Sequence, residues 1–172
     1  IARAAQMMKP SQAPRHRPNS RLTEIAFLKP WSSPAKISAT EWARAEIPAS
    51  NMHATAEALA RYVHPLANGG HAVDGARVID EKVVAAALRP RIEGADLVLP
   101  LDATWAAGLM GNSEGQFGPE PSAFGHAGFG GAAVVVDPAR RLSFAYTPTK
   151  MSPSLFGDPR FLALADALYA DF

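Results

Sequence analysis

Cysteine is absent from the 172 residues, which excludes disulfide bonds and thiol chemistry. No apolar run approaches the roughly 18 residues that a membrane-spanning helix needs, so we expect no membrane span. Zinc would have to rely on histidine and carboxylate ligands, and the histidines show no metal-like spacing, so we expect no metal. There are five of them: His16, His53, His64, His71 and His126. The composition, 48% hydrophobic and 19% charged, is that of a globular protein with one core.

Acidic residues are missing from positions 1–21, which carry five basic side chains: Arg3, Lys9, Arg15, Arg17 and Arg21. A basic arm can bind nucleic acid. This one has three prolines and no aromatic side chain to stack on bases, which favours a solvated segment and no nucleic-acid partner. The chain starts at Ile1 with no signal or transit pattern, so we expect it to begin inside a longer sequence.

Three helices are predicted between residues 39 and 90. ATEWARAE, residues 39–46, is a short helix ended by Pro48, and EKVVAAALR begins after an Asp80 N-cap and ends at Pro90. Between them, HATAEALARYVHPLANGG carries apolar residues at i, i+3, i+4 and i+7, which predicts an amphipathic helix that ends at the two glycines. The apolar stripe consists of Leu59, Tyr62, Val63 and Leu66.

Strands are expected in the second half of the chain. DLVLPLDATWAAGLM, residues 96–110, can hold one or two strands, and residues 111–123 are typical of a loop. GGAAVVVD and RLSFAYTP predict a β-hairpin with Val134 and Val136 on one face. The last segment, residues 158–172, predicts a helix that packs on this hairpin. Its apolar stripe consists of Phe161, Leu164, Ala165 and Leu168.

Two short motifs are typical of serine nucleophiles. GNSEG, residues 111–115, fits the G-x-S-x-G elbow around Ser113, which requires a helix directly after the serine. The proline- and glycine-rich QFGPEPSAFG follows instead, which favours a flexible loop. SPAK places Ser33 and Lys36 at S-x-x-K spacing, where a helix would bring amine and hydroxyl together. The sequence after it lacks a long apolar run, which favours an exposed turn.

A histidine lies among glycines in FGHAGFGG, residues 124–131. On a strand, His126, Gly128 and Gly130 would face one side, and Ala127 and Phe129 would face the other. The arrangement offers an imidazole beside bare backbone, with a peptide N–H free to bind a developing oxyanion. Glycine-rich strands with a satisfied histidine are common, so this pattern by itself does not establish a site.

HAG at 126–128, followed by FGGAAVVVDPARRLSFAYTPTK, resembles the third motif and following strands of the serine β-lactamase, penicillin-binding protein and esterase superfamily. In its class C-related, esterase-like branch, H-x-G often replaces K-T-G. HATAEALARYVHPLANGG resembles the segment of T-A-x-x-L-A-R type that ends in N-G-G, and the likeness covers about residues 40–172. It implies an α+β fold of the α/β sandwich type, with an antiparallel sheet flanked by helices. Residues 1–95 would form a helical and loop region, and 96–172 the C-terminal strands and closing helix.

The same resemblance implies roles for individual residues. His126 would replace the lysine and orient the substrate carbonyl or carboxylate, and Gly128 would let the substrate approach along a strand that includes Ala127 and Gly130. The backbone N–H of Phe129 would be one of two oxyanion donors, and the nucleophilic serine would supply the other. The family's Y-x-N motif is missing, and the S-x-x-K lies too close to the third motif. The chain therefore resembles the C-terminal half of such an enzyme, whose missing N-terminal part would be its partner.

The implied activity is that of a serine hydrolase, a carboxylesterase that attacks a small ester or amide through an acyl-enzyme without a cofactor. Histidine in place of lysine favours carboxylic esters over β-lactams. We expect the present chain by itself to be inactive. Two alternatives remain open: a catalytically inactive fragment or binding module, and an α/β-hydrolase that uses Ser113 with Glu114 or Glu120 and His126.

Overall fold

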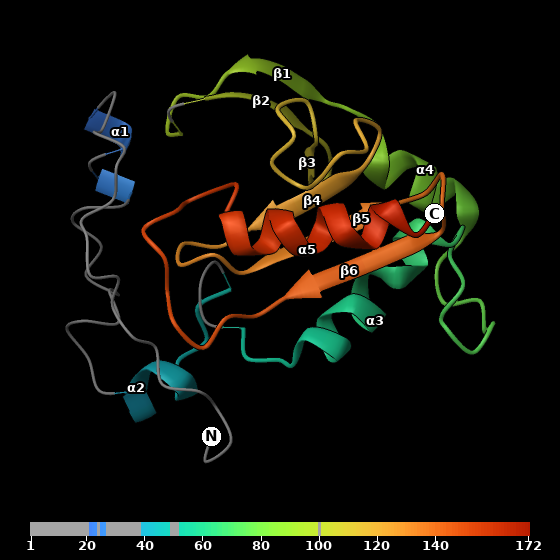
Figure 1. The fold of residues 1–172 in the computed structure, drawn as a ribbon, viewed down its shortest axis with the longest axis horizontal. Helices are drawn as coiled ribbons and strands as arrows, with labels where there is room; N and C mark the ends of the chain where they lie inside the picture. Colours follow the sequence, from blue (N-terminus) through green and yellow to red (C-terminus); the bar gives the residue numbers. More distant parts are fainter. Residues whose placement is uncertain (1–20, 24, 27–38, 49–51, 100) are drawn as a thin grey trace.

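The structure is a computed structural model that describes residues 21–23, 25–26, 39–48, 52–99 and 101–172. Its helices are α1 (Arg21–Thr23), α2 (Ala39–Arg44), α3 (Ala56–Ala67), α4 (Glu81–Leu88) and α5 (Pro159–Ala170). The strands are β1 (Ile92–Ala95), β2 (Asp102–Trp105), β3 (Met110–Gly111), β4 (Phe124–Ala127), β5 (Ala133–Asp137) and β6 (Leu142–Tyr146). They form one sheet in the order β1-β2-β3-β4-β5-β6, with each neighbouring pair antiparallel (Figure 1). The predicted antiparallel sheet flanked by helices is confirmed.

The last two strands form the predicted hairpin. Val135 of β5 faces Phe144 of β6, and the register continues to Asp137 opposite Leu142. The buried Asp137 carboxylate closes the turn by accepting hydrogen bonds from the N–H groups of Ala139 and Arg140. The alternation of GGAAVVVD and RLSFAYTP therefore predicts the pairing of these strands correctly.

Helices cover both faces of β5, because successive residues of a strand point to opposite sides. Val135 packs with Phe161 and Ala165 of α5, and Val136 packs with Val63 and Ala67 of α3. Figure 1 shows α5 lying across the front of the sheet. Val134 also packs against the α3 cluster, so Val134 and Val136 share a face as predicted. The closing helix lies on the hairpin, as predicted.

Local sequence explains where the helices begin and end. The Thr55 hydroxyl accepts a hydrogen bond from the N–H of Ala58 and caps α3, and the Asp80 carboxylate caps α4 as predicted. After α3, Gly70 has φ of +91°, and a Cβ there would overlap the carbonyl oxygen of Ile79. The predicted ends of these two helices are confirmed.

Two of the expected helix-stripe residues are not buried, and one strand was not expected. Tyr62 is 73% exposed and Leu164 is 49% exposed, so neither belongs to the buried stripe of its helix. Residues 96–110 hold β2 and the start of β3, so the expectation of one or two strands there is confirmed, and before β2 the Asp96 carboxylate accepts hydrogen bonds from the N–H groups of Val98 and Leu99 in a bend. β1 was not predicted, because all four of its residues are exposed and show no alternation.

A glycine of β4 lets a loop pack closely against the sheet. A Cβ at Gly125 would lie 2.6 Å from the ring of Phe117 and 2.5 Å from the carbonyl oxygen of Val134. The fully buried Phe117 therefore occupies the space that a side chain at position 125 would need. This contact fixes the loop between β3 and β4 beneath the strand that carries His126.

Candidate functional site

His126 lies near the end of β4, opposite Val134 of β5. Strand alternation places it on the α3 side of the sheet, and its side chain is exposed. The ring of Trp105 lies beside it, with centroids 6.2 Å apart and planes tilted by 48°. The Trp105 indole N–H donates a 2.9 Å hydrogen bond to Asp96. An aromatic surface of fixed orientation therefore lies beside the imidazole.

The pKa of Asp96 reflects this anchoring role. Burial by itself would raise it, but hydrogen bonds from Leu99, Val98 and the Trp105 indole together hold the pKa below its ordinary value. The carboxylate is consequently ionised at neutral pH, which strengthens the hydrogen bond that holds Trp105.

The backbone turns directly after β4. The strand alternation that we expected through Gly130 is wrong, because β4 ends at Ala127 and residues 128–131 form a turn. Within that turn Gly128 N–H donates to Ala132 O at 2.8 Å, and Gly131 N–H donates to Gly128 O at 3.1 Å. The N–H of Gly130 donates to Ser154 O at 3.3 Å.

Phe129 is the exception among the amides of this turn. Its N–H makes no hydrogen bond to any residue that the structure describes. Its side chain is 43% exposed. The free amide that the sequence predicts is therefore present, one residue beyond the exposed backbone of Gly128.

The three remaining predicted site residues have different surroundings. Gly128 is exposed, and a Cβ there would meet nothing closer than Ala132 at 3.9 Å. Gly130 is buried, and a Cβ there would lie 2.7 Å from the end of the Met151 side chain. Ala127 is partly buried and packs against the α5 cluster. Open backbone therefore exists at Gly128, whereas Met151 covers Gly130.

The chemistry of these groups suits a carbonyl oxygen that develops negative charge. A free amide N–H and an imidazole N–H are each able to donate a hydrogen bond to such an oxygen, and Gly128 leaves space beside the backbone. Neither group is a strong nucleophile, so the bond-forming group has to come from elsewhere.

Ser113 does not form a nucleophile elbow. It is exposed in the loop between β3 and β4, and the described residues that follow it form turns and then β4, with no helix. Glu120, one candidate acid, is bound to Arg140 and Ser122, and these hydrogen bonds lower its pKa to about 2. The sheet is antiparallel, so the α/β-hydrolase alternative is wrong. Ser33 and Lys36 lie outside the described residues.

Sequence reasoning missed one serine–histidine contact. His64 Nδ1 of α3 lies 3.1 Å from Ser143 Oγ of β6, and both side chains are partly buried. The two residues are 79 positions apart, so no local motif could have revealed them. None of the hydrogen bonds and ion pairs of the described residues links the His64 ring to a carboxylate, and the contact joins α3 to the last strand.

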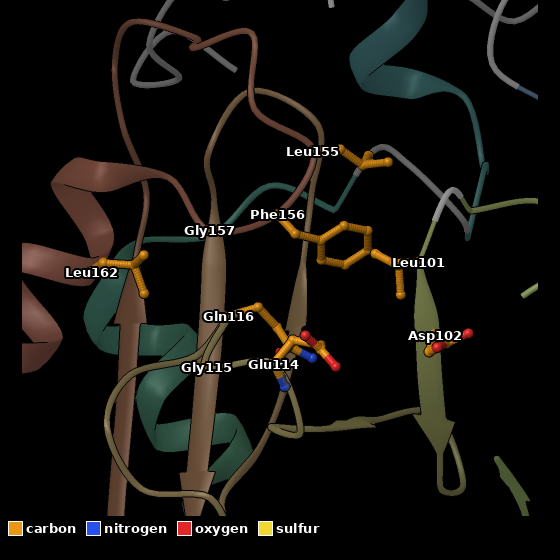
Figure 2. A pocket seen from close by; sticks show the side chains of 9 residues that line it. All are labelled: Leu101, Asp102, Glu114, Gly115, Gln116, Leu155, Phe156, Gly157 and Leu162. Atoms are coloured by element: carbon orange, nitrogen blue, oxygen red, sulfur yellow. Dashed lines mark hydrogen bonds between the residues drawn. The ribbon is translucent and has the colours of Figure 1, made fainter. Parts of the chain in front are cut away.

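A cavity of about 480 Å³ opens on the α5 side of the sheet (Figure 2). Figure 2 shows the Phe156 ring pointing toward Leu101, with Glu114 and Gln116 below it. The Gln116 amide is already engaged, because it accepts from the N–H of Glu114 and donates to the carbonyl of Gly111. None of the five predicted site residues lines this cavity. The residues that do are Leu101, Asp102, Glu114, Gly115, Gln116, Leu155, Phe156, Gly157 and Leu162.

The described ranges offer neither a metal-binding cluster nor a membrane-spanning helix. Their histidine, aspartate and glutamate side chains form no group of three or more that could hold a metal ion. Among the same residues, no helix is both long enough and apolar enough to cross a membrane.

Known proteins resemble this chain in sequence and structure. The sequence model described as Beta-lactamase matches residues 2–168. The esterase/beta-lactamase LipL of Mycobacterium tuberculosis (strain ATCC 25618 / H37Rv) is 36% identical over 118 residues, which is 66% of this chain and 26% of LipL.

Two crystal structures share the fold. A penicillin-binding protein homolog from Caulobacter crescentus is 44% identical with a TM-score of 0.88, over 96% of this chain and 44% of that chain. A family VIII carboxylesterase is 34% identical with a TM-score of 0.72, over 76% of this chain and 35% of that chain. This chain thus spans less than half of the length of each of these relatives, and about a quarter of LipL.

An antiparallel sheet between helices, matched over most of the chain, defines a fold of the β-lactamase and penicillin-binding protein class. The chain belongs to the Beta-lactamase family, whose members are serine hydrolases. The resemblance inferred from HAG and the preceding helix is confirmed at the level of the family and the fold.

Proposed function

We propose that this chain forms the C-terminal part of a serine carboxylesterase that acts on small esters through an acyl-enzyme. The observation that carries the proposal is the Phe129 N–H, which makes no hydrogen bond within the described residues. It directly follows the exposed Gly128 and lies three residues after the exposed His126. The esterase names of LipL and of the family VIII carboxylesterase support an ester substrate. The division at residue 95 into a helical and loop region and a C-terminal region of strands is part of this proposal, with β1, which pairs with β2, at the end of the first region.

In the proposed reaction, a serine from upstream sequence attacks the ester carbonyl carbon. The carbonyl π electrons move to oxygen, and the Phe129 N–H stabilises that oxyanion together with the serine's own N–H. His126 orients the carbonyl or carboxylate of the substrate, which approaches the open backbone at Gly128, whereas the buried Gly130 and the partly buried Ala127 support that backbone from the protein side. The serine proton passes to a basic group and then to the leaving alcohol as the C–O bond breaks. Water hydrolyses the acyl-enzyme and regenerates the serine.

The purified 172-residue chain should not hydrolyse a p-nitrophenyl ester above the buffer rate. A backbone donor and an imidazole stabilise charge but do not replace the nucleophile of an acyl-enzyme pathway. The release of p-nitrophenolate, followed at neutral pH, measures this. Robust turnover that Ser33→Ala or Ser113→Ala abolishes would contradict the prediction and would identify a nucleophile within the chain.

Gly128→Ala should reduce ester turnover without weakening the fold. A Cβ at this position meets only Ala132 at an ordinary contact distance, so the free energy of unfolding should change by less than about 1 kcal/mol. The same methyl group would project where the substrate approaches, so kcat/KM of the full-length gene product should fall about 10-fold. An equally active Gly128→Ala protein would remove this backbone from the substrate path.

The binding-module alternative predicts a different result in the same experiment. A module without catalysis would bind an ester without releasing its alcohol, with or without the Gly128→Ala substitution. Ester binding by calorimetry, without turnover by the full-length gene product, would replace the esterase proposal with this alternative.

A further inference from the structure

Residues 151–158 lie against the turn that presents the Phe129 N–H. The carbonyl of Gly130 accepts a 2.9 Å hydrogen bond from Ser152 N–H, and Gly130 N–H donates to Ser154 O at 3.3 Å. Both backbone polar groups of Gly130 are therefore bound to this segment. The segment leads directly into α5, so the turn is attached to the C-terminal helix.

The two glycines of the turn allow a close approach of side chains from this segment. Gly131 has φ of +102°, and a Cβ there would overlap the Oδ2 atom of Asp158. Gly130 has φ of +104°, and its open side is filled by Met151. Glycine is the residue that adopts these φ values without strain. The backbone of the turn at Gly131 therefore packs directly against the Asp158 carboxylate.

Asp158 itself is held firmly. Its side chain is 2% exposed, and its Oδ2 accepts a 2.8 Å hydrogen bond from Arg160 Nη2. Its Oδ1 accepts from the backbone N–H of Arg160 at 2.8 Å and from Arg160 Nε at 3.1 Å. The guanidinium also donates to Lys150 O at 2.9 Å, so the pair is fixed at both ends of the segment.

The charge on this carboxylate is stable at neutral pH. Burial by itself would raise the pKa of Asp158, but the hydrogen bonds from Arg160 and Ser152 outweigh burial and lower it to about 2. An ionised carboxylate keeps its charge-assisted bonds to Arg160, and these are stronger than the bonds of a neutral amide.

We propose that Asp158 is a positioning residue for the Phe129 N–H, and that it acts through Gly131 rather than by touching substrate. The inference rests on the proposed function, in which that N–H stabilises the oxyanion. The direction of an N–H depends on the backbone angles around it. A turn closed by Gly128 on one side and supported by Asp158 on the other has few ways to reorient.

The test uses the full-length gene product labelled with 15N-glycine and 15N-phenylalanine. Asp158→Asn keeps the size of the side chain and an acceptor for the N–H of Arg160, but it removes the charge. Asp80→Asn is the matched control, because Asp80 caps α4 through the same kind of bond, 2.8 Å to Lys82 N–H, and is exposed. Arg160→Gln is a second variant that keeps the carboxylate and removes the guanidinium that holds it.

In Asp158→Asn, amide exchange at Gly130 and Gly131 should become about 10-fold faster, and the Phe129 amide resonance should move. The Gly125 amide within β4 should keep its exchange rate, and Asp80→Asn should leave all of these amides unchanged. Arg160→Gln should act in the same direction as Asp158→Asn. With p-nitrophenyl acetate as substrate, kcat should fall about 10-fold and KM should change less than twofold, because the oxyanion forms only during the reaction.

Unchanged exchange at Gly130 and Gly131 in Asp158→Asn would overturn the inference. Faster exchange that extends equally to Gly125 would also overturn it, because Asp158 would then stabilise the whole fold rather than the turn. Faster exchange at Gly130 and Gly131 together with an unchanged kcat would have a different meaning. It would keep Asp158 as the residue that holds the turn and would remove the Phe129 N–H from the proposed reaction.

Discussion

Phe161→Ala should lower the free energy of unfolding by about 3–5 kcal/mol, which is the typical cost of truncating a buried phenylalanine. The Phe161 side chain is 1% exposed and attaches α5 to the hairpin. Its ring stacks on Phe144 with centroids 5.7 Å apart, and the ring of Tyr146 lies 6.3 Å away. Its neighbour on the inner face of α5, Ala165, is too small to fill the resulting cavity.

Leu164→Ala is the matched control for this substitution. It removes an apolar side chain from the same helix, but Leu164 is 49% exposed and leaves no buried cavity. Its effect should be below about 1 kcal/mol. Chemical denaturation measures both values, and the melting temperature of Phe161→Ala should fall by on the order of 10 °C. Equal losses in the two variants would contradict the packing of α5 on the sheet.

The contrast between Phe161 and Leu164 also shows what periodicity can predict. Apolar residues spaced three and four positions apart identify the apolar side of a helix. The spacing does not show which residues in the middle of that side are buried and which at its margins stay exposed. The partner surface decides which of them is buried. Tyr62 on α3 and Leu164 on α5 both fit the period and are both exposed, whereas Val63 and Phe161 are buried.

Strand prediction succeeded where the side chains alternate and failed where they do not, although both hairpins join strands that are close in the sequence. β5 and β6 alternate and are joined by a short turn, so their pairing follows from adjacent sequence. β1 consists of exposed residues and exists because Ile92 to Ala95 pair with β2. Backbone hydrogen bonds of this kind leave no pattern in the side chains.

The site residues proposed from the sequence stay a prediction, and the shape of the backbone around them was not predicted correctly. His126 and Phe129 were identified from HAG and the glycines, and the free N–H agrees with the expectation. The end of β4 at Ala127 was missed, because glycines fit an open strand as well as a turn with positive φ. Asp158 was missed because its contact with Gly131 joins segments that are distant in the sequence.

His126→Ala in the full-length gene product should reduce kcat/KM by roughly 10- to 1000-fold, which corresponds to about 1.4–4 kcal/mol of transition-state stabilisation. The loss should fall mainly on rate, because the imidazole contacts a group whose charge develops during the reaction. His126→Gln keeps a hydrogen-bond donor at a similar reach, so it should recover part of the lost rate. Initial rates with p-nitrophenyl acetate at fixed pH measure both variants.

Stability distinguishes this role from a purely structural one. The His126 side chain is exposed, and within the described residues its ring lies beside the ring of Trp105. Truncation therefore leaves no buried cavity and no unsatisfied buried polar group, and the melting temperature should hardly change. A histidine that served only to hold β4 in place would give the opposite result. The variant would then melt at a lower temperature but keep full activity per folded molecule, and His126 would no longer belong to the site.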